Sequence, residues 1–398
     1  MPAARWVPAF TAPLHAAEGD DPRFGDAALR FADVTLRQFV SPGLPGQTWR
    51  LRLSNEFGEV PLPIAGIQVG WRVGRQGPAV RRGSVREVRF GGRPTVHIAP
   101  GLTRASDPVS LPRRPRDAEG RLADLAITLF LREPTPRASW HLVGARSSYR
   151  SVPGSHLGAD DFPVAQTGHS LFFLAAVEVL APPATRVWVA FGDSITDGNG
   201  HTLDTTDAWP AQWGAAWAGC RRRGAPVGVL NAGVSGNRLL AGLQGLTGLG
   251  RFERDVLSVP GAAGVVMLIG INDLSTETTR EAALAMARRL ADAQARLARN
   301  ARAGGLKVVG ATLTPVGGSA YGRPEVEAGR QQLNAWIRGS TGVFDGVVDM
   351  DAAVRDPTRP DHFRAGWSVD GLHPGDAGQR AMALAVLDTL GQAGLAPC

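Results

Sequence analysis

Cysteine is nearly absent from this chain of 398 residues, which contains only Cys220 and Cys398. Because there is no CxxC pair and no cluster of Cys and His, the sequence indicates neither a zinc site nor a disulfide framework. No run of about 18 apolar residues occurs, so no segment is expected to span a membrane. No signal peptide precedes Trp6, so the chain as given is expected to be cytoplasmic, or secreted or periplasmic if a leader has been removed.

Lysine is also scarce: Lys307 is the only one, and the formal net charge of +7 comes from arginine. Residues 1–183 hold 22 Arg against 16 Asp and Glu, and no basic run is longer than three residues. A dispersed excess of this kind is typical of a solvated surface rather than a nucleic-acid-binding stripe, so nucleic acid is not an expected partner. An apolar content of 43% with 20% charged residues indicates a globular protein.

Residues 1–183 lack long helical periodicity and instead show short runs in which apolar and polar residues alternate. Clusters of Gly, Pro, Asn and Asp separate these runs, as in residues 54–58 and 113–120. Short strands at regular spacing, with turn signals between them, predict an all-β sandwich or jelly-roll domain. The runs that favour strands are 48–53, 67–73, 85–90, 125–131 and 170–179.

Two roles remain open for this first domain: binding carbohydrate on one face, or only shielding the domain that follows. Its tryptophans are expected in the core rather than on a sugar-binding platform, because large aromatic side chains are usually buried. These are Trp6, Trp49, Trp71 and Trp140. Residues 181–184 (APPA) favour a linker, so the expected domains cover residues 1–183 and 184–398.

From residue 184 onward, strands and helices alternate. Apolar runs predict strands at 187–191, 227–230, 264–269, 306–313 and 346–350. Helices are expected over 277–303, over 324–338, from about 377, and around Trp209, Trp213 and Trp217, whose spacing predicts one buried face. Asp376 and Gln379 have the spacing of a capping box for the last helix. This alternation predicts a five-stranded parallel sheet with helices on both faces.

Polar clusters are expected at the carboxyl ends of the strands: Ser194, Gly236 with Asn237, Asn272 with Asp273, and Asp370 with His373. In a parallel sheet these ends lie along one edge, where open α/β sheets bind ligands, so the clusters can meet. The residue types at this edge fit acyl transfer, because they include a hydroxyl, an imidazole, a carboxylate and an amide.

Each of these groups has a chemical role to fill. A serine nucleophile such as Ser194 needs a base, which His373 can provide, and Asp370 can orient that base through its second ring nitrogen. A tetrahedral intermediate needs donors for its oxyanion. The side-chain amide of Asn272 and the backbone N–H groups of Gly236 and Ser194 can supply them.

Four motifs carry a resemblance to a known family: Gly192-Asp193-Ser194, Gly236, Gly270-Ile271-Asn272-Asp273 and Asp370-Gly371-Leu372-His373. These motifs occur in the same order as in the GDSL, or SGNH, hydrolase superfamily, and the chain resembles that superfamily over residues 187 to about 390. The resemblance implies a flavodoxin-like, three-layer α/β/α domain without a GxSxG elbow, and no GxSxG occurs here. It also implies that Ser194 is the nucleophile, Gly236 and Asn272 are oxyanion donors, His373 is the base and Asp370 its orienter.

Ile195 stands where the GDSL motif has leucine, which is a common variation. Asp193 and Asp273 within the motifs are expected to hold their loops through local hydrogen bonds. The β-rich first half, combined with this second half, is similar to a two-domain bacterial subgroup of arylesterases or acylhydrolases.

The interpretation is a serine esterase, a carboxylic ester hydrolase that acts through an acyl-enzyme. The expected substrates are acetylated carbohydrate, aryl or short-chain acyl esters, and no metal or organic cofactor is required. One alternative is an acyltransferase that uses the same triad. Another is a carbohydrate-binding protein whose hydrolase domain is idle.

Several residues also have competing interpretations. Ser194 alone fits a turn serine or a helix N-cap, and Asn272 alone fits a cap of the next segment. Ser235 is a rival nucleophile on the second loop. His362, which follows an aspartate, resembles part of a dyad, but no serine at a strand end is expected beside it.

Overall fold

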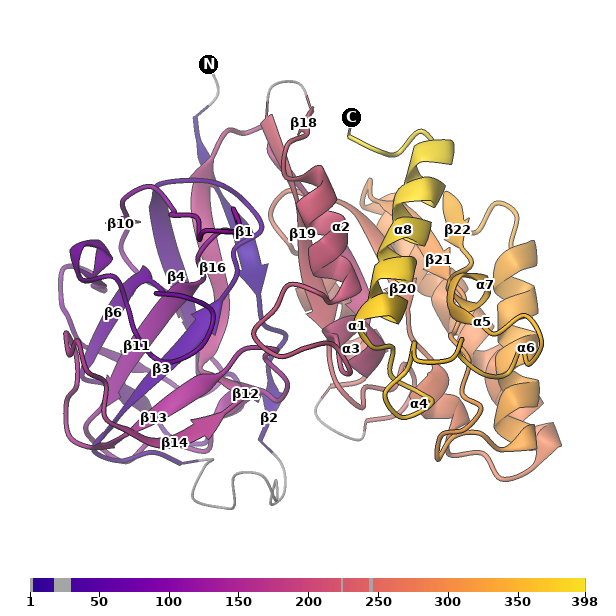
Figure 1. The fold of residues 1–398 in the computed structure, drawn as a ribbon, viewed down its shortest axis with the longest axis horizontal. Coiled ribbons are helices and arrows are strands. Elements are labelled where there is room, and N and C mark those ends of the chain that lie inside the picture. Colours follow the sequence, from indigo (N-terminus) through magenta and orange to yellow (C-terminus); the bar gives the residue numbers. More distant parts are fainter. Residues whose placement is uncertain (1–2, 18–29, 223–224, 243–245, 398) are drawn as a thin grey trace. The chain divides into compact units, whose positions relative to one another are not determined.

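The computed structural model describes residues 3–17, 30–222, 225–242 and 246–397, and the chain divides into two compact units. The first unit comprises Met1–Pro183 with Leu203–Thr205, and the second comprises Ala184–Thr202 with Thr206–Cys398. Strands β1 to β16 belong to the first unit, whereas strands β17 to β22 and helices α1 to α8 belong to the second (Figure 1).

The first unit is built from strands whose pairings among the described residues are antiparallel. The strands are β1 (Arg5–Thr11), β2 (His15–Ala16), β3 (Val34–Val40), β4 (Thr48–Ser54), β5 (Leu62–Ile64), β6 (Gly66–Trp71), β7 (Arg86–Glu87), β8 (Val96–Ile98), β9 (Thr103–Ala105), β10 (Val109–Ser110), β11 (Leu125–Leu131), β12 (Ser139–His141), β13 (Ser148–Pro153), β14 (Val164–Gly168), β15 (Leu171–Phe172) and β16 (Leu174–Ala181). A 3₁₀ turn, Arg82–Ser84, precedes β7. The predicted all-β class of this region is confirmed.

Two larger sheets form most of this unit. One has the order β1-β16-β4-β10, with β9 also paired to β4, and the other has the order β14-β13-β3-β11-β6-β7. The rings of Trp49, on the first sheet, and Trp71, on the second, meet edge to face with centroids 6.1 Å apart. Both side chains are almost fully buried, as is Trp140, so these three tryptophans belong to the core as predicted. Trp6 is only partly buried and lies under the guanidinium of Arg50.

A short segment from later in the chain completes the first unit. Leu203–Thr205 groups with it, and Asp204 there accepts a hydrogen bond of 2.8 Å from Arg72 Nη1. The N–H and hydroxyl of Ser147 also donate to this carboxylate, at 3.0 and 2.6 Å. Arg72 is fully buried, so Asp204 provides its counter-charge.

The second unit contains the predicted five-stranded parallel sheet, in the order β19-β17-β20-β21-β22, with β18 added antiparallel at the β19 edge. Its strands are β17 (Arg186–Gly192), β18 (Arg221–Arg222), β19 (Ala225–Gly233), β20 (Ala262–Leu268), β21 (Lys307–Ala311) and β22 (Gly346–Val348). Its helices are α1 (Ser194–Asp197), α2 (Trp209–Trp217), α3 (Gly248–Phe252), α4 (Ile271–Leu274), α5 (Arg280–Ala303), α6 (Pro324–Gly339), α7 (Met350–Val354) and α8 (Asp376–Gln392), with a π-helical turn, Glu253–Leu257, after α3.

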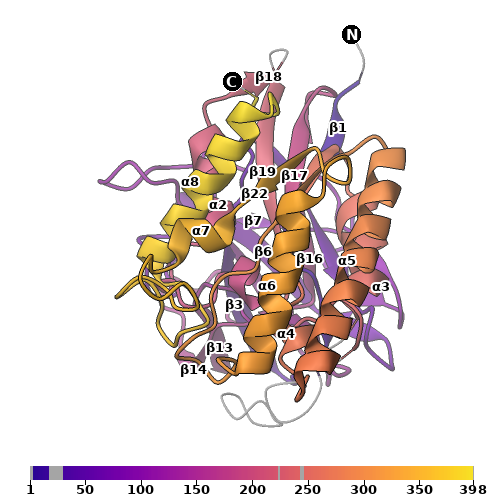
Figure 2. The same cartoon turned by 90° about the vertical axis from the view of Figure 1, so that its right-hand side faces the viewer.

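Two helix pairs cover this sheet. Helix α2 packs against α8, and α5 packs against α6. Figure 2 shows the sheet between these two pairs, which gives the three-layer α/β/α arrangement. Trp209, Trp213 and Trp217 are buried and contact one another along α2, so the predicted buried face is confirmed.

The start of α8 differs from the prediction. Its N-cap is Gly375, and no side chain caps it. Asp376 instead accepts hydrogen bonds from the N–H and hydroxyl of Thr202, and Gln379 Oε1 accepts one from the N–H of Trp209. The predicted capping box is therefore wrong, because Asp376 binds the segment between α1 and α2 and Gln379 binds the first residue of α2.

Cys220 is disulfide-bonded, which the cysteine count did not predict, and Cys398 lies outside the described residues.

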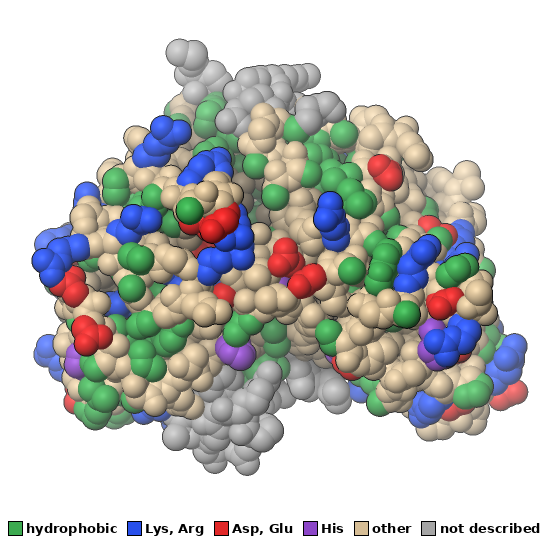
Figure 3. Space-filling view, in the orientation of Figure 1, with side chains coloured by type: hydrophobic (Ala, Val, Ile, Leu, Met, Phe, Trp, Pro, Cys, Tyr) green, Lys and Arg blue, Asp and Glu red, His purple; other side chains and the backbone are tan. Residues whose placement is uncertain are grey.

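Charged side chains are distributed over the surface. On the face drawn in Figure 3, blue basic side chains lie scattered, and several lie next to red acidic ones. Exposed pairs such as Arg121 with Asp117 illustrate this mixing of charge.

Candidate active site

Ser194 stands at the first turn after the central strand β17. Asp193 caps α1 by accepting a hydrogen bond from the N–H of Ile195 (3.1 Å), which makes Ser194 the first residue of the helix. A Cβ at Gly192 would overlap the hydroxyl of Thr196 and the carbonyl oxygen of Leu268, so only glycine fits at this strand end. The Ser194 side chain thus emerges at the carboxyl edge of the sheet.

His373 lies within hydrogen-bond reach of this serine. Its Nε2 is 2.9 Å from Ser194 Oγ, and its Nδ1 is 2.7 Å from Asp370 Oδ2. The other carboxylate oxygen of Asp370 accepts the N–H groups of Leu372 (2.9 Å) and His373 (2.7 Å). Gly200, at a φ of +95°, packs against this loop so closely that a Cβ there would be 2.7 Å from the carbonyl oxygen of Pro374 and 3.2 Å from the Cβ of His373.

The Asp370 carboxylate is held in its ionised form. Partial burial alone would raise its pKa, but the hydrogen bonds from the His373 N–H, the His373 ring and the Leu372 N–H outweigh that effect. The pKa of Asp370 therefore lies below its ordinary value. An anionic carboxylate beside Nδ1 stabilises the imidazolium that forms when Nε2 takes a proton.

One detail of the predicted geometry is wrong. Asp370 and His373 do not directly follow a strand: α7 and residues 355–369 lie between β22 and this loop. The loop still reaches Ser194, as the Oγ–Nε2 distance shows. The loop is held in part by Ser368, which donates its hydroxyl to the carbonyl oxygen of His373 (2.8 Å) and accepts the N–H of Gly371 (2.9 Å).

Asn272 belongs to α4, directly after β20, and is buried. One N–H of its Nδ2 donates to the carbonyl oxygen of Asn237 (3.1 Å), which leaves its second N–H for another acceptor. The backbone N–H groups of Ser194 and Gly236 donate no hydrogen bond to any group in the described part of the chain. Three donors are thus available on the loops that follow β17, β19 and β20.

Tyr321 is a residue of this site that the sequence analysis missed. Its hydroxyl donates to Asn272 Oδ1 (3.0 Å), and this bond fixes which end of the amide carries the N–H groups. Tyr321 lies on the segment after β21, at the carboxyl edge of the sheet. The rule that strand ends carry functional residues could have indicated this loop, but no motif marked the tyrosine within it.

The rival residues have other partners. The hydroxyl of Ser235 donates to Asp197 Oδ2 (2.7 Å) and lies 3.2 Å from Asn199 Oδ1. His362 Nδ1 is 2.9 Å from its neighbour Asp361. Neither residue has the serine–histidine contact that Ser194 and His373 form.

A buried arginine and two buried aspartates hold the loops around the site. Arg251 donates to the carbonyl oxygens of Gly192 (2.7 Å) and Ala232 (2.8 Å) and pairs with Asp255 (3.0 Å). Asp273 accepts the N–H groups of Leu239 and Leu240, far away in the sequence, so it braces two loops instead of only its own. Asp193 makes the local bond described above.

Among the described residues, no group of three or more His, Cys, Asp or Glu side chains is arranged to hold a metal ion. Within the same part of the chain, no helix combines the length and the apolar character needed to cross a membrane.

A three-layer α/β/α domain with Ser194, His373 and Asp370 joined at one edge is suited to nucleophilic hydrolysis. Residues 190–381 match the model of the GDSL-like Lipase/Acylhydrolase family, and this part of the chain belongs to that family. The chain is therefore a carboxylic ester hydrolase of the esterase or acylhydrolase type. No curated protein matches the chain.

Solved structures include similar proteins. A GDSL-like lipase from Bacteroides thetaiotaomicron is 20% identical, with a TM-score of 0.39 over 52% of this chain and 89% of that one. TesA is 25% identical, with a TM-score of 0.39 over 52% of this chain and 99% of that one. A catalytic mutant of Axe2, an acetylxylan esterase from Geobacillus stearothermophilus, is 20% identical, with a TM-score of 0.39 over 53% of this chain and 95% of that one.

Proposed function

We propose that the chain hydrolyses small carboxylic esters through an acyl-enzyme on Ser194. The observation that carries the proposal is the continuous chain of hydrogen bonds from Ser194 Oγ through the His373 ring to the Asp370 carboxylate. A neutral imidazole at this distance can take the serine proton, and the carboxylate stabilises the charge that the ring then acquires.

In the first half of the reaction, Ser194 Oγ attacks the ester carbonyl carbon while His373 Nε2 takes the hydroxyl proton. The carbonyl oxygen becomes an oxyanion, which the N–H groups of Ser194 and Gly236 and the amide of Asn272 receive. The bond to the alcohol oxygen then breaks, His373 returns the proton to the leaving alcohol, and the acyl group stays on Ser194.

In the second half, water takes the place of the alcohol. His373 Nε2 removes a proton from the water, whose oxygen attacks the acyl carbon. The bond between the acyl carbon and Ser194 Oγ breaks, the proton returns to Oγ, and the carboxylic acid leaves. Every step uses side chains and backbone N–H groups of the second unit together with water, so the proposed mechanism requires no cofactor.

The proposed substrates are acetylated carbohydrates, aryl esters and short-chain acyl esters. A panel of p-nitrophenyl esters of increasing acyl length, together with acetylated sugars, would separate them by kcat/KM. An assay with added acceptor alcohols would show whether the acyl group passes to water or to an alcohol.

Replacing the proposed nucleophile tests the mechanism. Ser194→Ala should reduce kcat by about 10⁴-fold or more, because a methyl group cannot form the acyl-enzyme. Its circular dichroism spectrum and melting temperature should match those of the wild type. Ser235→Ala is the matched control and should retain turnover, since that hydroxyl binds Asp197 instead of the imidazole. Turnover by Ser194→Ala at the wild-type rate would contradict the proposal.

A further inference from the structure

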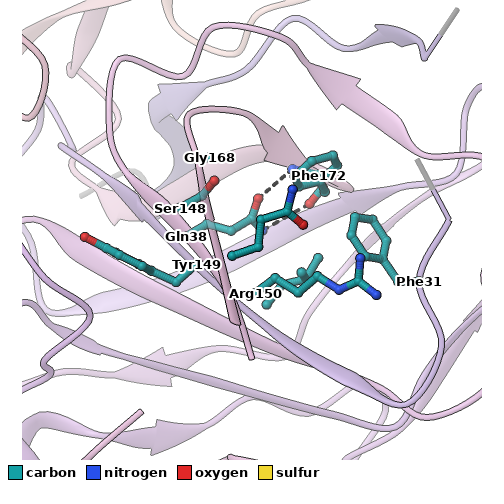
Figure 4. A pocket seen from close by; sticks show the side chains of 9 residues that line it. Phe31, Gln38, Ser148, Tyr149, Arg150, Gly168 and Phe172 are labelled. Atoms are coloured by element: carbon teal, nitrogen blue, oxygen red, sulfur yellow. Dashed lines mark hydrogen bonds between the residues drawn. The ribbon is translucent and has the colours of Figure 1, made fainter. Parts of the chain in front are cut away.

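The first unit contains two cavities of very different chemistry. One, shown in Figure 4, has a volume of about 320 Å³ and is lined by Phe31, Tyr149 and Phe172 among others. The side-chain amide of Gln38, which lines this cavity, already has hydrogen-bond partners. It donates to the carbonyl oxygen of Phe172 (3.1 Å) and accepts the N–H of Phe172 (2.5 Å). This amide holds strands together, so it is not available to a ligand.

The second cavity, of about 430 Å³, lies over a row of polar residues that crosses three neighbouring strands. Arg37 on β3 is paired with Thr128 on β11, and Thr128 is paired with Gln68 on β6. Residues opposite one another in antiparallel strands lie on the same face, so the three side chains stand side by side beneath this cavity. Arg82, Gly158 and Asp160 also line it.

Arg37 is an exception among the buried arginines. The side chains of Arg72, Arg146, Arg251 and Arg330 each pair with a carboxylate at 3.0 Å or less. Arg37 is only 3% exposed but forms no ion pair within the described residues. A buried charge without a counter-charge is costly, so an anion bound from outside the chain would stabilise this arginine.

The guanidinium of Arg37 keeps donors free. Its Nε donates to Thr128 Oγ1 (3.1 Å), one Nη1 hydrogen goes to the carbonyl oxygen of Pro78 (2.9 Å), and the group lies 4.3 Å from the centre of the Phe162 ring. Three of its five N–H groups therefore have no acceptor in the described part of the chain. Burial lowers the pKa of Arg37 to about 10, a value at which it is still cationic at neutral pH.

The neighbouring polar groups are also arranged as donors. Gln68 Oε1 accepts the N–H of Gly158 (2.7 Å), which leaves the Nε2 hydrogens of Gln68 free to donate. Thr128 Oγ1 accepts from Arg37, so its own hydrogen can be donated. The Asp160 carboxylate at the rim is neutralised by Arg82 (2.9 Å), and the cavity therefore holds one uncompensated positive charge.

We propose that this cavity binds a small monocarboxylate, with its carboxylate on the free edge of the Arg37 guanidinium and on Gln68. A planar carboxylate matches the fork of a guanidinium, and a single negative charge balances the single unpaired positive one. This volume includes space open to solvent, so a small carboxylate can enter the cavity. The site is distinct from the proposed esterase centre and requires no turnover there.

Calorimetric titration of the full chain tests this proposal. Sodium acetate and sodium D-glucuronate should each bind saturably at one site, and D-glucose, which lacks the charge, should bind at least about tenfold more weakly than D-glucuronate. Inorganic sulfate, which is doubly charged and tetrahedral, should bind more weakly than D-glucuronate. If neither carboxylate binds saturably, or if sulfate binds more tightly than both, the proposed ligand class is wrong.

Variants locate the site. Arg37→Met should weaken D-glucuronate binding by at least about tenfold, and Gln68→Leu by about three- to tenfold, while both retain the ester turnover of the wild type. Arg86→Met makes the same change at an exposed arginine outside the cavity and should bind like the wild type. If Arg37→Met does not fold, Gln68→Leu still tests the proposal. Undiminished D-glucuronate binding by Gln68→Leu would contradict the proposed site.

Discussion

At the scale of single residues, Asn272 shows how one side chain can be prepared for a transient charge. Tyr321 occupies its oxygen, and the carbonyl of Asn237 takes one of its two amide hydrogens. The remaining N–H is fixed before any substrate arrives. A donor oriented in advance stabilises an oxyanion without the cost of reorganising at the moment of reaction.

Asn272→Ala should therefore reduce kcat by about 10²–10³-fold and change KM by only about a few-fold. The reason is that the ground-state carbonyl is bound less strongly than the oxyanion that forms in the transition state. Steady-state kinetics on a p-nitrophenyl ester measures both constants. A large increase in KM at constant kcat would instead identify Asn272 as a substrate-binding group.

Two further variants act as graded controls for Asn272. Tyr321→Phe should lower kcat by about three- to tenfold, since it removes only the bond that orients the amide. Asp273→Asn should affect thermal stability more than kcat, because Asp273 binds Leu239 and Leu240 in the loop after β19. Equal losses of kcat in all three variants would mean that they act through a general disturbance of the loops.

Asp193 predicts a pH dependence of stability. Its complete burial, together with the nearby charge of Asp273, raises its pKa to about 7 despite the opposing hydrogen bond from Ile195. One carboxylate oxygen, Oδ2, is buried with no hydrogen-bond partner in the described structure, so no donor stabilises a negative charge on it. The folded state therefore keeps a proton that the unfolded state releases near about pH 4. The contribution of Asp193 to the free energy of unfolding is complete below about pH 4 and is lost as the pH rises through about 7.

Asp193→Asn isolates that contribution, because asparagine stays neutral and can still accept from Ile195. The free energy of unfolding of the variant minus that of the wild type should increase between about pH 5 and about pH 8, because only the wild type loses stability over this range. Denaturant titrations at several pH values measure the difference directly. A difference that does not vary with pH would show that Asp193 is ionised throughout.

The motif residues and the Ser194–His373–Asp370 pairing could be predicted from the sequence, whereas partners outside the motifs could not. Ser194, Asn272, Asp370 and His373 occur in recognisable motifs in the family's order. Tyr321 was missed because its role depends on where a long loop folds, and nothing within residues 314–323 marks it. The partners of Arg37 were equally hidden, since strand pairing decides which side chains stand beside it.

At the scale of elements, Arg251 connects the ends of β17 and β19. It donates to Gly192 and Ala232 at these strand ends, to Asn237 Oδ1 (2.8 Å), and to Asp255. Arg251→Met should lower the free energy of unfolding by about 3–5 kcal/mol, because it leaves two buried carbonyl oxygens without their donor and leaves the buried Asp255 carboxylate paired only with Arg254. Chemical denaturation measures this loss.

Arg299→Ala, at an exposed position of α5, is the control for that experiment and should change stability by no more than about 0.5 kcal/mol. A similar loss in both variants would mean that arginine content, and not the buried contacts of Arg251, determines the effect.

The elements themselves followed from the sequence to a large extent. The five parallel strands and the helices α2, α5, α6 and α8 were predicted because apolar periodicity reports burial directly. Element ends were less predictable. The run at residues 346–350 forms a strand only to Val348, since Met350 begins α7, and the expected capping pair of α8 binds Thr202 and Trp209 instead.

At the scale of the whole molecule, the chain joins an all-β unit to a GDSL-like hydrolase domain. A break between residues 183 and 184 was expected from composition. The three residues Leu203–Thr205 nevertheless group with the first unit, through contacts such as Asp204 with Arg72. Such a return of the chain has no sequence signal, because an aspartate in a loop resembles any other surface residue.

The central claim is that Ser194 is the nucleophile of an ester hydrolase, and covalent trapping tests it most directly. A fluorophosphonate probe should react once per chain, and peptide mass spectrometry should place the adduct on Ser194. The adduct should disappear in Ser194→Ala and persist in Ser235→Ala. An adduct on Ser235, or labelling that survives in Ser194→Ala, would contradict the account.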